Sequence, residues 1–157
     1  MRPEHAVYIN TAYLFQGMRE ETRERILETA LEESHAPGDF LFHQGEPARE
    51  FYVLMEGRVR ISVGVQGLLA HVASDPGDMV GWSSLVGNPT YTASAECLGP
   101  VKVSKLEKSQ LDRILVADPV SGMTFFKHLA VLIGRRLAQS YAATLAGHGV
   151  QEPRSYG

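Results

Sequence analysis

Residues 38–63, GDFLFHQGEPAREFYVLMEGRVRISV, decide the fold. Apolar runs alternate in this stretch with residues that form turns: the runs are 40–42, 51–55 and 59–65, and the turns are 45–47 and 56–57. In the third run, apolar side chains alternate with Arg60 and Ser62, a period of two that is typical of a strand with one buried face. Gly45 and Gly57 fall at the corners, where a positive φ is commonly needed. The stretch therefore predicts consecutive antiparallel strands joined by tight turns.

The same alternation of apolar runs and turns continues as far as Glu107. The further runs are 68–73, 91–98 and 101–106, and the corners between them are Asp75-Pro76-Gly77 and Gly99-Pro100. Short strands at regular spacing, with Gly and Pro at the corners, predict a small barrel or jelly roll over residues 36–107. An immunoglobulin-type sandwich is the weaker alternative, because it leaves no place for helices on either side.

Helical spacing precedes the predicted strands. Apolar residues spaced by four, among them Ile26 and Ala30, predict a helix over 18–33. The apolar segment 13–17 comes before it and ends in a turn. Ala36-Pro37-Gly38-Asp39 then breaks the helical pattern.

Two further helices are predicted after the strands, over 108–117 and 120–146, with Asp118-Pro119 between them. The long helix has two apolar faces. One is a heptad-like seam made by Met123, Phe126, Ala130, Ile133, Leu137 and Ser140, and the other is made by Phe125, Leu129 and Leu132. We expect one face to cover the barrel and the other to pair with a second copy, so Val120–Ala146 predicts a homodimer. The alternative is a helix enclosed within one core.

The size of the chain favours a single domain, since it has 157 residues. The predicted division is an N-terminal arm at 1–12, a domain at 13–146 and a flexible tail at 147–157. A content of 44% hydrophobic and 21% charged residues is typical of a soluble globular protein. The net charge of -3 gives no basic field that would favour nucleic acid.

The sequence shows few features that would direct the protein to a membrane or to secretion. Met1–Asn10 contains no apolar run of the kind found in signal peptides, and Cys97 alone cannot form an internal disulfide. The apolar stretch Leu129–Ile133 is far shorter than the roughly 20 residues of a membrane span. The sequence therefore predicts a cytoplasmic protein without a membrane segment.

Side chains that could support catalysis or bind a metal do not form a recognisable motif. His43 is the one histidine of the strand region with an acidic residue close by, Glu46, and His71 stands alone on its strand. A metal cupin would need a further histidine from a later strand, and 91–97 contains none. No nucleophile elbow and no phosphate-binding loop of the Walker type is present. We therefore expect no enzyme activity and no metal, with a metal-dependent cupin-like enzyme as a remaining alternative.

The spacing of the opening stretch is similar to that of a known family. Gly38–Phe42, Gln44–Ala48, Phe51–Leu54 and Gly57–Ile61 resemble the cyclic nucleotide-binding domain of catabolite-activator-type regulators, protein kinase A regulatory subunits and gated ion channels. The resemblance extends from about Tyr13 to Ser140. It implies a mainly β fold: an eight-stranded jelly roll (double-stranded β-helix) with an N-terminal helix and a long C-terminal helix that pairs two subunits.

The resemblance also implies a ligand site, the family's phosphate-binding cassette. Its usual form is Gly-Glu-(Leu or Met)-Ala-(Leu), a few residues, and then Arg-(Ser or Thr)-Ala. Backbone N–H groups and the Arg hold the cyclic phosphate, and the Glu accepts a hydrogen bond from the ribose 2′-hydroxyl. The residues at these positions here are Gly81, Trp82, Ser83, Ser84, Tyr91, Thr92 and Ala93. Trp82 therefore stands where the family has its Glu, and Tyr91 where it has its Arg.

Losing two such contacts weakens cyclic nucleotide binding, because each charge-assisted hydrogen bond contributes roughly 1.5–3 kcal/mol. Trp82 and Tyr91 either present stacking surfaces to a different ligand or fill the pocket so that nothing binds. The resemblance further implies that the long helix closes over a ligand, with Ser140 and Tyr141 facing the pocket. A cyclic nucleotide or another small molecule is the one kind of bound group that the sequence suggests.

The function expected from these features is that of a non-catalytic, ligand-sensing regulatory module with altered or lost cyclic nucleotide specificity, which signals through a dimeric C-terminal helix. Binding of cAMP or cGMP by a non-standard mode is the alternative. A transcription factor of the catabolite-activator type is not expected, because about a dozen residues follow Leu145, too few for a helix-turn-helix. We therefore expect no DNA binding.

Overall fold

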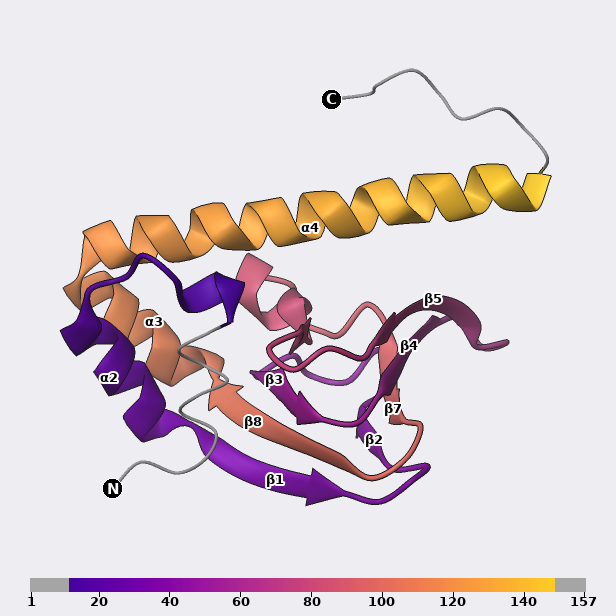
Figure 1. Ribbon diagram of the computed structural model, residues 1–157, viewed down its shortest axis with the longest axis horizontal. Helices are drawn as coiled ribbons and strands as arrows, with labels where there is room; N and C mark the ends of the chain where they lie inside the picture. The colour runs from indigo at the N-terminus through magenta and orange to yellow at the C-terminus, as the bar shows by residue number, and fades with distance from the viewer. Residues whose placement is uncertain (1–11, 149–157) are drawn as a thin grey trace.

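The computed structural model describes residues 12–148 (Figure 1). The elements in chain order are η1 (Tyr13–Phe15), α2 (Glu20–Thr29), β1 (Leu31–His35), β2 (Phe40–Phe42), β3 (Glu50–Glu56), β4 (Val59–Val63), β5 (Leu68–Ala73), β6 (Met79–Val80), η2 (Trp82–Val86), β7 (Ser94–Cys97), β8 (Val101–Glu107), α3 (Lys108–Ala117) and α4 (Pro119–His148). Of the predicted N-terminal arm, residues 1–11 lie outside the described residues, as does the predicted tail from 149 onward.

The strands form two four-stranded antiparallel sheets, one with the order β1-β8-β3-β6 and the other with the order β2-β7-β4-β5. Strands distant in the chain become neighbours, as in the pairing of Leu31 with Lys105 and of Val59 with Cys97. A bridge between Pro47 and Thr90 lies outside these ladders. This arrangement, with a helix before the sheets and a long helix after them, confirms the predicted jelly-roll fold.

Two apolar clusters hold these layers together. The first, between the sheets, includes the buried residues Tyr52, Leu54, Val59 and Val103. In the second, α2, α3, η1 and the start of α4 pack against the outward side chains of β3. Because β3 alternates its side chains between two faces, it contributes to both clusters and joins the roll to the helices.

The boundary between α2 and β1 differs from the predicted helix over 18–33. The helix spans Glu20–Thr29 and ends where Ala30 adopts an extended conformation, with ψ of 137°. The Thr29 hydroxyl donates to the Ile26 carbonyl at the last turn. Leu31–His35 then pairs with β8 in continuous register. The sheet therefore begins at 31 and not at 36, because pairing along β8 outweighs the helical spacing of this segment.

The first half of α4 packs onto the body of the protein. Phe125 and Leu129 are buried, and the Phe125 ring lies 5.7 Å from that of Phe15. On the opposite side, Met123 and Leu137 remain 62% and 50% exposed. Figure 1 shows α4 running the full length of the molecule, past the end of the roll. Of the two apolar faces predicted for this helix, the one with Phe125 and Leu129 therefore packs on the body of the protein, and the one with Met123 and Leu137 is largely exposed.

The junction of α3 and α4 is fixed by Asp118. Its carboxylate accepts hydrogen bonds from the Thr22 hydroxyl at 2.5 Å and from the Ser121 backbone N–H at 3.4 Å. These contacts tie α2 to the first turn of α4. Among the helices of residues 12–148, none combines the length and hydropathy that a membrane crossing requires.

Candidate functional site

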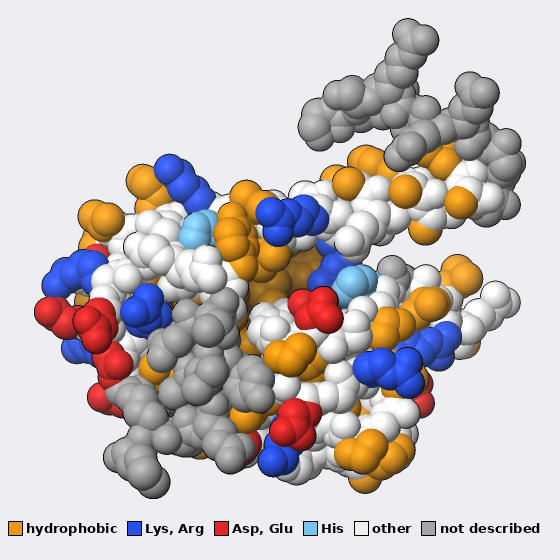
Figure 2. Space-filling model, in the orientation of Figure 1, with side chains coloured by type: hydrophobic (Ala, Val, Ile, Leu, Met, Phe, Trp, Pro, Cys, Tyr) orange, Lys and Arg blue, Asp and Glu red, His pale blue; other side chains and the backbone are white. Residues whose placement is uncertain are grey.

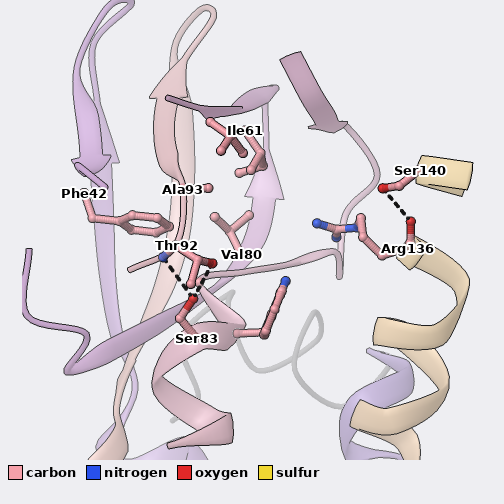
Figure 3. Close-up of a pocket in the computed structure, with 11 residues that line it drawn as sticks. Phe42, Ile61, Val80, Ser83, Thr92, Ala93, Arg136 and Ser140 are labelled. Atoms are coloured by element: carbon pink, nitrogen blue, oxygen red, sulfur yellow. Dashed lines mark hydrogen bonds between the residues drawn. The ribbon is translucent and has the colours of Figure 1, made fainter. Parts of the chain in front are cut away.

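A cavity of about 170 Å³ lies between the roll and α4 (Figure 3). Its walls come from β2, β4, β6, the segment that begins at Gly81, and α4. The lining residues are Phe42, Ile61, Val63, Val80, Gly81, Trp82, Ser83, Thr92, Ala93, Arg136 and Ser140. The cavity therefore coincides with most of the cassette that the sequence analysis placed at 81–93.

Gly81 sets the direction of the chain at the edge of this cavity. Its φ is +90°, and a Cβ atom there would lie 3.2 Å from the Phe42 ring. A glycine is therefore favoured both by the left-handed conformation and by the close packing. It precedes the short helix η2, in which the Ser84 hydroxyl donates back to the Gly81 carbonyl at 3.2 Å. Ser84 is fully buried and does not line the cavity.

Ser83 and Thr92 form a pair of hydroxyls on the cavity wall. Their oxygens are 3.1 Å apart, and the Ser83 hydroxyl also accepts a hydrogen bond from the Thr92 backbone N–H at 3.3 Å. Figure 3 shows Ser83 pointing toward Thr92 beneath the apolar side chains of Phe42 and Val80. These hydrogen bonds join the two ends of the cassette, the short helix η2 and the segment that leads into β7.

Tyr91 does not face the cavity. Its ring stacks on Phe42 with centroids 3.7 Å apart, and its hydroxyl donates to the Glu50 carbonyl at 2.6 Å. The same oxygen accepts from the Glu50 N–H at 3.3 Å. Burial raises the pKa of Tyr91 to about 12. The residue at the position of the family's Arg is therefore a buried contact within the roll and presents no stacking surface to a ligand here.

Trp82 lines the cavity and is partly buried against the helical core. Its indole leaves open space beside Gly81 and Thr92, so it does not fill the site completely. Of the two residues predicted to face the site from α4, Ser140 lines the cavity, and Tyr141 is 49% exposed and outside the lining.

Arg136 is a cavity residue that the sequence analysis missed. It projects from α4 toward the roll (Figure 3) and lies one helical turn before Ser140, whose hydroxyl donates to the Arg136 carbonyl at 3.2 Å. Burial lowers the pKa of Arg136, and attraction from Asp78 opposes that change. The sequence contained a signal for Arg136: it stands four residues before Ser140, and residues four apart share one helix face.

A second hollow of about 480 Å³ lies on the other side of Arg136. Its lining includes Tyr13, His71, Asp78 and Arg135. Figure 2 shows a hollow beneath α4 with an apolar floor and with acidic, basic and histidine side chains around it. The Arg135 guanidinium lies over the Tyr13 ring at 5.4 Å. Burial and the charge of Arg136 lower the pKa of His71.

The side chains considered for a metal do not converge. The His43 ring nitrogen lies 3.2 Å from a Glu46 carboxylate oxygen, and the same carboxylate accepts a hydrogen bond from the His43 backbone N–H. This pair therefore stabilises the turn after β2, and His71 lies in the second hollow. Within residues 12–148, no group of three or more His, Cys, Asp or Glu side chains could hold a metal ion.

The fold and the cavity define a class of domain, a jelly roll in which a small cavity lies between a β-roll and a long C-terminal helix. The profile of the family described as "Cyclic nucleotide-binding domain" matches residues 32–118. Because that match covers more than half of the chain, this chain belongs to the cyclic nucleotide-binding domain family.

Individual proteins are similar to this chain in sequence, and solved structures are similar to it in fold. The chain is 31% identical over 101 residues to a cAMP-dependent protein kinase regulatory subunit of Hypocrea atroviridis; the match covers 64% of this chain and 21% of that protein. A putative cyclic nucleotide-binding protein from Geobacter metallireducens has a similar structure, with a TM-score of 0.74, 23% identity, and coverage of 87% of this chain and 99% of that one. The regulatory domain of Toxoplasma gondii PKA, solved with cAMP, matches with a TM-score of 0.67 and 21% identity over 78% of this chain and 48% of that one.

The chain spans only about a fifth of the length of the kinase subunit and less of a canine cyclic nucleotide-gated channel, of which it matches 13%. The similarity to these proteins therefore concerns one part of each of them, not their full length.

Proposed function

We propose that this chain is a non-catalytic ligand-sensing module whose preference differs from that of the usual cyclic nucleotide site. The observation behind the proposal is the position of Tyr91. The phenol is buried, stacked on Phe42 and hydrogen-bonded to Glu50. It supplies no charge to a phosphate from the position where the family has its Arg. Trp82 likewise offers no carboxylate to a ribose hydroxyl.

The cavity itself supports a ligand and not a purely structural role. Open space remains beside Gly81 and Thr92, and the two hydroxyls of Ser83 and Thr92 lie at its wall. An apolar cavity with a few polar groups is the usual form of a small-molecule site. Its volume, about 170 Å³, is below the roughly 300–1,000 Å³ of common ligand pockets, which favours a compact ligand.

Binding of cAMP or cGMP in a non-standard mode is the second candidate. The observation that favours it is that Gly81, Ser83, Thr92 and Ala93 all line the cavity, so the backbone frame of the cassette is retained. In this mode the nucleotide would be held without the usual Arg and Glu. A larger opening between α4 and the roll would be needed to admit it.

Thermal denaturation in the presence of a broad panel of small molecules tests the sensor role. The panel should contain cAMP, cGMP, linear nucleotides and small organic acids, each at millimolar concentration. A ligand present at about 100 times its Kd stabilises the folded state by roughly 2.7 kcal/mol, which gives a clear shift in Tm. We expect at least one compact ligand to raise Tm more than cAMP does. A panel in which no compound changes Tm would argue for a purely structural domain.

A further inference from the structure

The charge in the cavity comes from α4 and not from the cassette. Among the lining residues, Arg136 is the one with a formal charge at neutral pH, and no carboxylate is among them. The inference that follows rests on the proposed ligand-sensing function. It concerns what kind of molecule the cavity holds and how the bound molecule acts on α4.

Arg136 is partly buried and forms no ion pair with the residues that the structure describes. Among residues 12–148, no carboxylate oxygen lies within 4.0 Å of its guanidinium, whereas the shortest ion pairs of this part of the chain include one of 2.6 Å between Lys108 and Asp112 and one of 2.9 Å between Arg19 and Glu21. Asp78 attracts this guanidinium only from beyond that distance. A partly desolvated cation without a close partner is unfavourable, and an anion brought to it would relieve that cost. A Glu at position 82, the family's usual residue, would have put a carboxylate into the same cavity. Trp82 leaves the guanidinium available.

The facing wall offers a hydrogen-bond donor. Ser83 and Thr92 have one hydroxyl proton each, and a single hydrogen bond joins their oxygens. One of the two protons therefore forms that hydrogen bond, and the other can be donated to a third group. Both Ser83 and Thr92 line the cavity, so the free proton lies at its wall whichever of the two oxygens carries it. Oxyanions accept hydrogen bonds from hydroxyls and from guanidinium groups alike.

Apart from Gly81 and Ser140, the remainder of the lining is apolar. Phe42, Ile61, Val63, Val80, Trp82 and Ala93 surround the space between Arg136 and the hydroxyl pair. Apolar walls favour an apolar body on the ligand, and the volume of about 170 Å³ limits that body to about the size of an aromatic ring.

We propose that the cavity binds a compact organic oxyanion, a carboxylate or phosphate group on a ring-sized apolar body, whose charged group is held by Arg136. In this domain the cation that contacts the anion is therefore on the long helix, at Arg136, and not in the cassette, where Tyr91 stands at the position of the family's Arg. The ligand then bridges the hydroxyl pair of the roll and the guanidinium of α4.

This placement gives the ligand a direct effect on the long helix. From residue 134 onward α4 is largely exposed, and Arg136 and Ser140 are its contributions to the cavity. A ligand bound to both walls therefore adds a contact that holds this half of the helix against the roll. Hydrogen exchange of the amides in 134–146 should slow when the ligand binds, because exchange there follows local opening.

Titrations with two anionic probes and a neutral one test this inference. Benzoate represents the carboxylate class, phenyl phosphate the phosphate class, and benzyl alcohol an uncharged molecule of similar size. We expect benzoate or phenyl phosphate to bind the wild-type protein and to slow exchange in 134–146. Arg136→Gln should weaken that binding by about 10–100-fold, and Arg136→Lys by less. Benzyl alcohol should bind the wild type and Arg136→Gln equally weakly.

Arg135→Gln is the matched control, because Arg135 is the next residue on the same helix but lies over Tyr13 in the second hollow. It should bind the probes as the wild type does. Equal affinity of Arg136→Gln and Arg135→Gln for the anionic probe would overturn the inference and leave the sensor role intact. Failure of the wild type to bind either anionic probe would also overturn it. The sensor role fails separately, if the broad panel contains no stabilising ligand.

Discussion

At the scale of single residues, Tyr91 shows how a binding position can become part of the core. The ring stacks on Phe42, and the hydroxyl forms two hydrogen bonds with the backbone of Glu50. These contacts join the segment before β7 to the start of β3. The side chain therefore contributes to the stability of the roll at a place where the family's Arg would face a ligand.

The change Tyr91→Phe should destabilise the protein by about 1–2 kcal/mol, because it keeps the stacking but removes the hydroxyl that satisfies the Glu50 carbonyl. Urea denaturation followed by circular dichroism measures the loss. Tyr141→Phe is the control, since that phenol is exposed, and its effect should stay within about 0.5 kcal/mol. Equal stability of Tyr91→Phe and the wild type would contradict the structural role given to the hydroxyl.

At the scale of elements, the connection between α3 and α4 depends on one carboxylate. Hydrogen bonds from Ser121 and Thr22, and then the charge of Arg19, lower the pKa of Asp118 below its ordinary value. As the pH falls, the Asp118 carboxylate of the unfolded chain is therefore protonated at a higher pH than that of the folded protein. The stabilisation is complete above the ordinary pKa of an aspartate, about 3.9, and is lost as the pH falls through the lower folded value.

The variant Asp118→Asn should thus be less stable than the wild type at pH 6, and the difference should shrink as the pH is lowered from about 5 toward 3. Urea midpoints of both proteins across this range provide the measurement. Asp112→Asn serves as a control, because Asp112 forms a partly exposed pair with Lys108 within α3. A stability difference between wild type and Asp118→Asn that is independent of pH would contradict the role given to the charged form.

The elements also show which parts of the structure a sequence can predict. The strands β3, β4 and β8 and the helix α3 follow directly from apolar alternation and from corners such as Gly57, whose φ is +95°. The end of α2 does not, because the apolar spacing continues through Leu31 while pairing with β8 decides its conformation. Long-range pairing of this kind is not encoded in local periodicity.

The same limit applies to the site. The resemblance to the family's motif placed the cassette at Gly81, Ser83 and Thr92, which are near one another in the chain. Arg136 enters the cavity from more than forty residues further on, and only the packing of α4 brings it there. Whether Tyr91 faced a ligand or the core was a matter of side-chain direction, which depends on the Phe42 ring across the sheet.

At the scale of the whole molecule, α4 has one face on the body of the protein and one that is uncovered. Met123, Phe126 and Leu137 share the uncovered face at helical spacing and are 62%, 42% and 50% exposed. A second copy of the same helix would be complementary to this stripe through a two-fold axis. The dimer proposed from the sequence is therefore compatible with the exposed surface, and it would place two cavities beside one shared helical pair.

The variant Phe126→Glu should shift the protein from dimer to monomer, because it introduces a charge into the centre of the apolar stripe. Sedimentation equilibrium at several concentrations measures the shift. Val65→Glu is the matched control: Val65 is also an exposed apolar residue, but it lies in the turn between β4 and β5. A wild type that is monomeric at all concentrations would contradict the dimer.

The central claim is that the site belongs to a cyclic nucleotide-binding domain but lacks the contacts that make such a site bind cAMP tightly. A site with a Kd of about 1 µM that loses two contacts of about 1.5–3 kcal/mol each would bind at about 0.1 mM or more weakly. Isothermal titration calorimetry of cAMP into the wild-type protein tests this claim most directly. We predict a Kd of about 0.1 mM or weaker, and a Kd of about 1 µM or tighter would contradict the account.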